Sequence, residues 1–387
     1  MKKIHYISLI VAVMLSSSCR NQTPELNSPS VSPTIENWVD VFDYFWETTS
    51  SSYMFWDVTD LDWDEVRAEY RPKFEELSLN TIKGDSLALV YFTEMVTPFV
   101  DHHYVLTLKG TNIISPSTIR NQQRDDYHAS FDRSILYKVL SEDMADRVES
   151  LKYYSTTNTA MYSALIDGTV AYFSLDSFKI YDKITTESVN AILQNFYNII
   201  GETEGLEGII IDVRNNPGGY NYDENFVLAP LIEEPLTMYY QRLKNSISPM
   251  DYTPWAPIVL SPYNPVNYDH SIPIISLADI NSVSMAELTT MAIKSLPNGL
   301  SVGERTWGGH GSIATQYDSF YSGKFSLSSY FDVYCATYST RPTFDNILEG
   351  IGVTPDIEVR WDEEKINQGV DVQLEAAISY IKGTYQN

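Results

Sequence analysis

The sequence predicts an α/β fold: a parallel sheet that follows a helical N-terminal subdomain. In the second half of the chain, short apolar runs that read as buried strands alternate with longer runs that read as helices. This alternation is typical of βαβ units, in which helices connect parallel strands. The expected strands are 171–175, 208–213 and 272–277, and the expected helices are 187–200, 223–231 and a run beginning at Met285.

The N-terminal part of the molecule, residues 34–100, has a helical pattern instead. Its first helix places apolar residues at helical spacing, namely Trp38, Val41, Phe42, Phe45 and Trp46. A second helix is expected to open at Asp62 and run through Tyr70, and a third to span Asp85 to Val96, with Pro98 just beyond its end. We therefore expect a helical subdomain at 34–100 and an α/β core at 101–387.

The first 33 residues have the composition of a targeting segment. Lys2 and Lys3 precede an apolar stretch of 4–15, and small residues then lead to Cys19, as in a secretory signal peptide. The stretch ending at Cys19 resembles a bacterial lipobox, in which the cysteine becomes the lipidated first residue. We expect a signal peptide at 1–18 and a lipidated Cys19 followed by a polar tether through residue 33. The corresponding location is the bacterial cell envelope, with a lipid anchor in the outer membrane and the protein on its periplasmic or surface face.

Charge and cysteine content exclude several other classes of protein. The net charge of −25 argues against binding to nucleic acid and against adsorption to anionic lipid, so any contact with a membrane is expected through the lipid anchor alone. If Cys19 carries lipid, Cys335 is the only other cysteine and no intramolecular disulfide is possible. The composition says nothing about oligomeric state.

A candidate nucleophile lies where a strand is expected to meet a helix. The apolar run through Leu277 stops at Asp279 and Asn281, and a helix-compatible run begins at Met285. Ser284 therefore occupies a strand-to-helix corner, where the free amides of the first helical turn point toward whatever its hydroxyl attacks. The ordinary alternative is a serine that only caps the helix.

A glycine-rich turn follows another buried strand. Pro217, Gly218 and Gly219 close the segment that begins at Asp212, and paired glycines let a backbone come close to a ligand. Amides at the carboxyl end of a strand are suited to stabilising an oxyanion, so we predict oxyanion donors in Gly218 or Gly219 and in Met285. Alone, the segment is an ordinary tight turn.

Two further segments contain side chains that could take part in proton transfer. His102 and His103 lie side by side in the sequence, and in an extended segment they would point to opposite faces, so that only one could reach a site. Glu349 precedes a glycine-rich loop that could hold its carboxylate against the site. Each segment also has a purely structural interpretation.

Taken in order, these segments resemble the C-terminal-processing protease family and its tricorn-core-protease branch. The matching stretches are Asp212–Gly219, Asn281–Glu287, Gly303–Gly308 and Gly350–Asp356. The resemblance covers roughly residues 37–381. It implies a ClpP/crotonase-like fold and a secreted serine peptidase acting on peptides or proteins without a cofactor or metal. It also implies Ser284 as nucleophile, His103 as base and Glu349 as the residue that orients the base.

The chain departs from the family pattern in two places. Bacterial processing enzymes carry a catalytic lysine after the Thr-x-Gly turn, whereas this chain has Gly308, Gly309 and His310 there. His310 is therefore an alternative base, and the role of His102, where the tricorn branch has serine, stays open. The second departure is that residues 109–165 lack the features of a PDZ module.

Two rival interpretations remain. Asp101-His102-His103 also resembles the start of the metal-dependent DHH phosphoesterase motif, but no D-x-D precedes it at a strand end. The other rival is a catalytically inactive relative that binds peptides or glycans at the cell surface. The missing lysine favours that rival, whereas the presence of Ser284, His103 and Glu349 together argues for a peptidase.

Overall fold

The computed structural model describes residues 34–156, 159–314 and 322–386. The expected signal peptide, Cys19 and the tether to residue 33 lie outside the described residues. Within the described ranges, no helix combines the length and the apolar character that crossing a membrane requires.

A sheet with a parallel centre organises the described chain. Its seven described strands follow the order β14-β10-β9-β6-β5-β4-β3. Pairing is parallel from β5 to β14 and antiparallel among β3, β4 and β5. This confirms the predicted α/β class, and it brings the carboxyl ends of β5, β6, β9 and β10 to one edge. The bounds are β3 Val148–Thr156, β4 Thr159–Ile166, β5 Val170–Leu175, β6 Gly208–Asp212, β9 Ile274–Ala278, β10 Gly299–Gly303 and β14 Ile357–Glu358.

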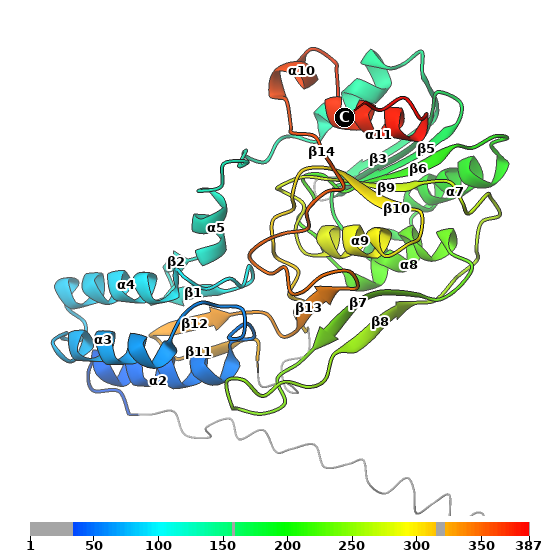
Figure 1. Ribbon diagram of the computed structural model, residues 1–387. Helices are drawn as coiled ribbons and strands as arrows, with labels where there is room; N and C mark the ends of the chain where they lie inside the picture. The colour runs from blue at the N-terminus through cyan, green and yellow to red at the C-terminus, as the bar shows by residue number, and fades with distance from the viewer. Residues whose placement is uncertain (1–33, 157–158, 315–321, 387) are drawn as a thin grey trace, which may run out of the picture.

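Helices cover both faces of this sheet, as Figure 1 shows. On one face, α7 and α9 pack against alternate strand residues such as Phe173, Ile209 and Ile211 in a large apolar core. On the other, Leu374 and Ile378 of α11 pack against Ile210 and Ile275. Because both faces are covered, the central strands are apolar on both sides, as their continuous runs predict. The helices are α6 Ser134–Lys138, α7 Glu187–Glu202, α8 Glu224–Val227, α9 Met285–Lys294, α10 Glu363–Asn367 and α11 Val372–Ile381.

The N-terminal helices form a second layer together with a small sheet (Figure 1). Aromatic side chains of α2, α3 and α4 pack on strands in the order β11-β12-β1-β2. β11 and β12 come from far along the chain, so this layer contains residues from both sides of the expected boundary at residue 100. The bounds are α2 Trp38–Ser52, α3 Trp63–Glu75, α4 Ile82–Val96, β1 Val105–Leu108, β2 Asn112–Ile114, β11 Phe325–Leu327 and β12 Phe331–Tyr334.

The remaining elements are short connections and a third sheet. β13, β7 and β8 pair antiparallel in that order. The expected helix at 223–231 is broken into short pieces, because Pro230 cannot donate an interior helical hydrogen bond. These elements are α5 Pro116–Asn121, β7 Leu236–Arg242, β8 Ala256–Leu260, β13 Ser339–Pro342, the π-helical turn η1 Val139–Asp143 and the 3₁₀ turns η2 Tyr181–Lys183, η3 Asn221–Asp223 and η4 Ala229–Leu231.

Candidate active site

Ser284 occupies the corner between β9 and α9 in a backbone conformation that few L-residues adopt. Its φ is +56° and its ψ is −115°. Such conformations cost about 1–3 kcal/mol and persist only where the surroundings fix them. Here the Ser284 amide donates to the Glu287 carboxylate at 3.2 Å, and the Ser284 carbonyl accepts from Leu288 at 3.0 Å. The half-buried serine is therefore held at the N-terminus of α9.

The glycine turn after β6 lies directly against this serine. A Cβ on Gly218 would come within 2.7 Å of the Ser284 Cβ and 2.9 Å of the Met285 amide nitrogen, and the Gly218 φ is +94°. Asn216 fixes the approach from the same turn, because its carbonyl accepts from the Val283 amide at 2.9 Å. Only glycine satisfies both the close contact and the backbone angle at position 218.

The three predicted oxyanion donors differ in whether their amides are occupied. Gly218 donates its amide to the Asn216 side-chain oxygen at 2.8 Å. By contrast, the amides of Gly219 and Met285 have no hydrogen-bond partner among the described residues. The two amides without a partner are thus the ones available to a substrate oxygen in this conformation.

The carboxylate of Glu287 connects the serine corner to the loop after β10. Besides the Ser284 amide, it accepts from the Thr306 hydroxyl at 2.6 Å and from the amides of Gly308 and Gly309 at 2.8 and 2.6 Å. Burial raises the pKa of Glu287 above its ordinary value, and these donors oppose that shift. Four donors around one buried carboxylate fix the relative position of two loops.

The two adjacent histidines do not point to opposite faces, contrary to the expectation from an extended segment. The chain turns at 102–103 between α4 and β1, and the two ring centroids lie 4.9 Å apart. The turn is held by Asp101, whose carboxylate accepts from the amides of His103 at 2.7 Å and Ala336 at 2.8 Å. Both rings can therefore face one site.

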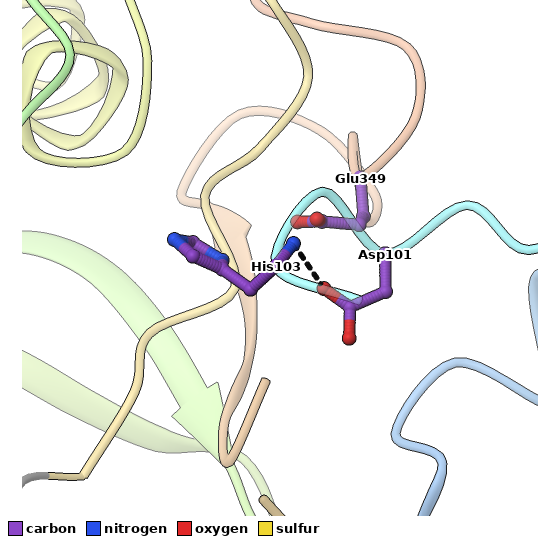
Figure 2. A group of neighbouring side chains, drawn as sticks. All are labelled: Asp101, His103 and Glu349. Carbon is purple, nitrogen blue, oxygen red and sulfur yellow. Dashed lines mark hydrogen bonds between the residues drawn. The ribbon is translucent and has the colours of Figure 1, made fainter. Parts of the chain in front are cut away.

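Glu349 binds backbone amides of the histidine turn and of the loop that carries His310. Its carboxylate accepts from the amides of His102 at 2.8 Å, His310 at 3.0 Å and Gly311 at 2.7 Å. Figure 2 shows its carboxylate beside His103, whose backbone nitrogen donates to Asp101. The nearest ring nitrogen of His310 lies 3.9 Å from the same carboxylate.

Burial keeps the imidazoles of this group neutral. It lowers the pKa of His103 to about 4, and burial together with the nearby His103 lowers that of His310 to about 3. Burial also holds the pKa of His102 well below its ordinary value. A neutral imidazole is the form that accepts a proton, so each ring is in a state suitable for a base.

The two acids beside the imidazoles shift the other way. Burial raises the pKa of Asp101 to about 6, although the amides that it accepts oppose the shift. Burial and the proximity of Asp101 raise the pKa of Glu349 well above its ordinary value. Arg120 supplies the nearby positive charge, with its guanidinium donating to the carbonyls of Phe99 and Val100.

Among the described residues, Asp101, His103 and Glu349 are a group that could hold a metal ion. One candidate ligand atom from each lies within 4.8 Å of the others. Every carboxylate oxygen in the group already accepts at least one backbone amide. The same oxygens thus fix the turn and the loop that carry the histidines.

The structure gathers the predicted residues into two adjoining groups. Ser284, Gly218, Gly219 and Met285 form one group, and His103, His310 and Glu349 form the other. The link is Gly309: it donates to Glu287 and lies so close to His102 that a Cβ on it would meet the His102 Cβ at 2.5 Å. Within the described chain, no hydrogen bond joins the Ser284 hydroxyl to a histidine ring.

Two acids that assemble this site, Asp101 and Glu287, lie in motifs named from the sequence, but they were given no role there. Both had a recognisable signal. Glu287 lies three residues after Ser284, the spacing of a capping box, and Asp101 lies two residues before His103, where its carboxylate can accept that residue's amide.

Comparison with known proteins gives the class to which this fold and site belong. Residues 169–359 match the model of peptidase family S41. The Tricorn protease of Thermoplasma volcanium is 30% identical over 189 residues, which cover 49% of this chain and 16% of that protein. Tricorn protease homolog 1 of Streptomyces coelicolor is 28% identical over 182 residues, covering 45% of this chain and 14% of that one. This chain thus aligns with only a small part of either relative.

A solved structure extends the likeness over most of the fold. A putative peptidase from Parabacteroides merdae superposes with a TM-score of 0.67 at 21% identity, covering 90% of this chain and 97% of that one. The segment that the family model matches, residues 169–359, contains Ser284, the glycine turn and Glu349. The match of residues 169–359 to peptidase family S41 agrees with the family that the sequence motifs predicted.

Proposed function

We propose that this chain is a serine-type peptidase that hydrolyses peptides or proteins through an acyl-enzyme. One observation carries the proposal: Ser284 is held in a strained conformation at the N-terminus of α9, against the glycine turn at Gly218, and the amides of the neighbouring residues Gly219 and Met285 have no hydrogen-bond partner among the described residues. A hydroxyl next to preorganised amide donors is the arrangement that acyl transfer requires.

The proposed reaction assigns a role to each group. The Ser284 hydroxyl attacks the carbonyl carbon of the substrate and gives its proton to an imidazole, which we assign to His103. The developing oxyanion accepts hydrogen bonds from Met285 and Gly219, and from Gly218 once its amide leaves Asn216. The imidazole then protonates the leaving amine, and water hydrolyses the ester. A protonated His103 would draw the pKa of Glu349 back down, since opposite charges at close range favour each other's charged form.

The choice of His103 over His310 rests on position. His103 matches the base of the tricorn branch, and it is half-buried, whereas His310 is fully enclosed. A ring nitrogen of His310 lies 3.9 Å from the Glu349 carboxylate, and one of His103 lies within 4.8 Å of it, but among the described residues neither ring is hydrogen-bonded to it.

One observation favours the alternative of an inactive peptide-binding relative. The Ser284 hydroxyl makes no hydrogen bond to an imidazole within the described chain, so transfer of its proton requires a movement when substrate binds. Such contacts often tighten only in the substrate complex. Hydrolysis that is lost when Ser284 is replaced would show a peptidase rather than an inactive relative.

The test compares Ser284→Ala with the wild-type chain on casein and on quenched fluorescent peptides. We expect hydrolysis to fall to background while the melting temperature changes little, because alanine keeps the backbone and removes one half-buried hydroxyl. Ser141→Ala, at a half-buried position in η1, is the matched control and should retain full activity. Residual hydrolysis in Ser284→Ala equal to that of the control would refute the assignment.

We further propose that the protein works outside the cytoplasm as a lipoprotein. Before Cys19, basic residues are followed by an apolar stretch and then by small residues, and this pattern supports the proposal. A protein at that location would act on peptides or proteins of the cell envelope. Endopeptidase rather than exopeptidase cleavage is part of the same proposal.

A further inference from the structure

A cavity of about 380 Å³ opens near the carboxyl edge of the central sheet. Its walls come from the segment 131–137, from the β3–β4 hairpin and from the ends of β5 and β6. No role assigned so far uses this cavity. Its size falls in the range of pockets that enclose a ligand group.

One residue of the cavity wall is close in the chain to the glycine turn that contacts the candidate nucleophile. Asn215 lines it, and Asn215 is three residues from Gly218, which touches Ser284. Three residues of chain span at most about 11 Å. The buried carboxylate of Asp279 also connects the two sites, because it accepts from the Asn215 amide at 2.8 Å and the Asn281 amide at 3.0 Å.

A second residue of the cavity wall is also linked to the glycine turn. Asp176 lines the cavity two residues before Phe178, and the Phe178 amide donates to the Gly218 carbonyl at 2.9 Å. An extended peptide advances about 3.3 Å per residue. A substrate bound at Ser284 would therefore bring a side chain to this cavity within about three residues of the scissile bond.

Aromatic rings form much of the wall. Tyr137 and Tyr153 stack with centroids 4.2 Å apart, and the ring of Tyr162 lies 5.8 Å from that of Tyr137. Tyr153 is 43% exposed, so part of its ring is open to a ligand. Aromatic faces attract both apolar groups and cations, and the charges nearby decide between them.

The charge accessible to a ligand is negative. Asp132 and Asp176 line the cavity, and neither forms an ion pair in the part of the chain that the structure describes. Arg133 is the cation of the lining, but it is 8% exposed, donates to the Ser174 hydroxyl and has its other terminal nitrogen buried 4.0 Å from Asp212. The guanidinium is thus largely enclosed beside Ser174 and Asp212, whereas Asp132 is exposed and Asp176 is half-buried.

We propose that this cavity is a specificity subsite that binds a lysine or arginine side chain of the substrate. The inference rests on the proposed peptidase function. The cation would lie against the tyrosine rings and pair with Asp176 and Asp132, while its methylene groups cover the aromatic surface.

The experiment uses two sets of quenched peptides with one common sequence. In the first set a lysine occupies each position around the scissile bond in turn, and in the second a glutamine occupies the same positions. At one position within about three residues of the bond, we expect kcat/KM for lysine to exceed that for glutamine about tenfold, as a cation–π contact and an ion pair together allow. Asp176→Asn should remove most of this preference, measured as the ratio of kcat/KM for the lysine peptide to that for the glutamine peptide. Asp332→Asn, on the distant β12, is the control and should keep the preference.

Binding to Ser284→Ala separates this inference from the proposed function. Fluorescence anisotropy of the labelled lysine and glutamine peptides should show the same preference, again lost with Asp176→Asn. Selective binding without hydrolysis by the wild type would refute the peptidase and leave the subsite. Hydrolysis without a lysine preference, or with faster cleavage of a glutamate peptide, would refute the subsite, and the latter result would assign the cavity to Arg133 and an acidic side chain.

Discussion

Ser284 has its strained backbone because residues on three sides hold it there. Gly218 packs against its Cβ, Glu287 accepts its amide, and Val283 before it donates to the Asn216 carbonyl. A flexible serine would have to be ordered at each turnover, whereas this one is positioned in the folded state. Preorganisation of this kind is where much of the catalytic power of such sites originates.

At the same scale, the two candidate bases can be separated by substitution. His103→Ala should lower kcat/KM by about 10²–10⁴-fold, the usual contribution of a general base. His310→Ala is expected to have a much smaller effect on kcat/KM, although it leaves a cavity in a buried position. Circular dichroism of both variants controls for folding. The reverse order of the two effects would transfer the role of base to His310.

The pH profile tests the same assignment independently. A base acts in its neutral form, and burial lowers the pKa of His103 to about 4. Above that pH the ring stays neutral, so kcat/KM should hold until about pH 4–5 and fall below it, rather than fall near the ordinary histidine pKa of about 6.5. The measurement is kcat/KM against pH, with the fold monitored at each point. Because burial raises the pKa of Asp101 to about 6, the profile is also measured for Asp101→Asn, and an acid limb near pH 6.5 that persists in that variant while it stays folded would contradict a base buried in this environment.

Sequence alone could locate Ser284, the glycine pair and Met285, because strand, breaker and helix patterns are local. It could not determine how His102 and His103 are oriented. That depends on a turn fixed by Asp101, whose partner amide at Ala336 lies far along the chain. It also could not show that Asn216 occupies the Gly218 amide, since this depends on one side-chain rotamer.

At the scale of elements, the N-terminus of α9 and the loop after β10 are joined by one side chain. Glu287→Gln keeps the volume of Glu287 but has only one oxygen for four donors, and its NH₂ group would face amides that also donate. We expect the free energy of unfolding to fall by about 2–4 kcal/mol and kcat to fall with it. Urea unfolding and peptide kinetics measure both effects.

Glu76→Gln, at an exposed position after α3, is the matched control and should change neither quantity. If Glu287→Gln were as stable and as active as this control, the carboxylate would not be the link between the two loops.

The positions of most central elements were predictable because their patterns are strong. The helix expected at 187–200 is α7, Glu187–Glu202, and the strand expected at 208–213 is β6, Gly208–Asp212. Pairing between distant segments was not predictable. β12 joins β1 under the N-terminal helices, and no local pattern in residues 331–334 specifies that partner.

At the scale of the whole molecule, the site forms where the two layers meet. The histidine turn leaves the helical layer after α4, and Ser284 and Glu287 belong to the central sheet with its helices. Glu349 and Asp101 connect them by accepting amides from distant loops. The geometry of the site therefore depends on how the two layers pack.

The proposed lipid tether can be tested by membrane partitioning. If Cys19 is lipidated, the protein expressed in a bacterial host should partition with membranes and enter the detergent phase. Cys19→Ala should release it or stall its processing, while Cys335→Ala, which alters a buried thiol, should leave partitioning unchanged. Equal solubility of wild type and Cys19→Ala would refute the lipid anchor.

Covalent labelling can identify the nucleophile, which we propose is Ser284. The purified chain would be treated with a serine-directed fluorophosphonate, digested and mapped by mass spectrometry. We expect a single adduct on Ser284, blocked by prior incubation with substrate peptide and absent from Ser284→Ala. An adduct on a different serine, or hydrolysis that continues while Ser284 is fully labelled, would contradict it.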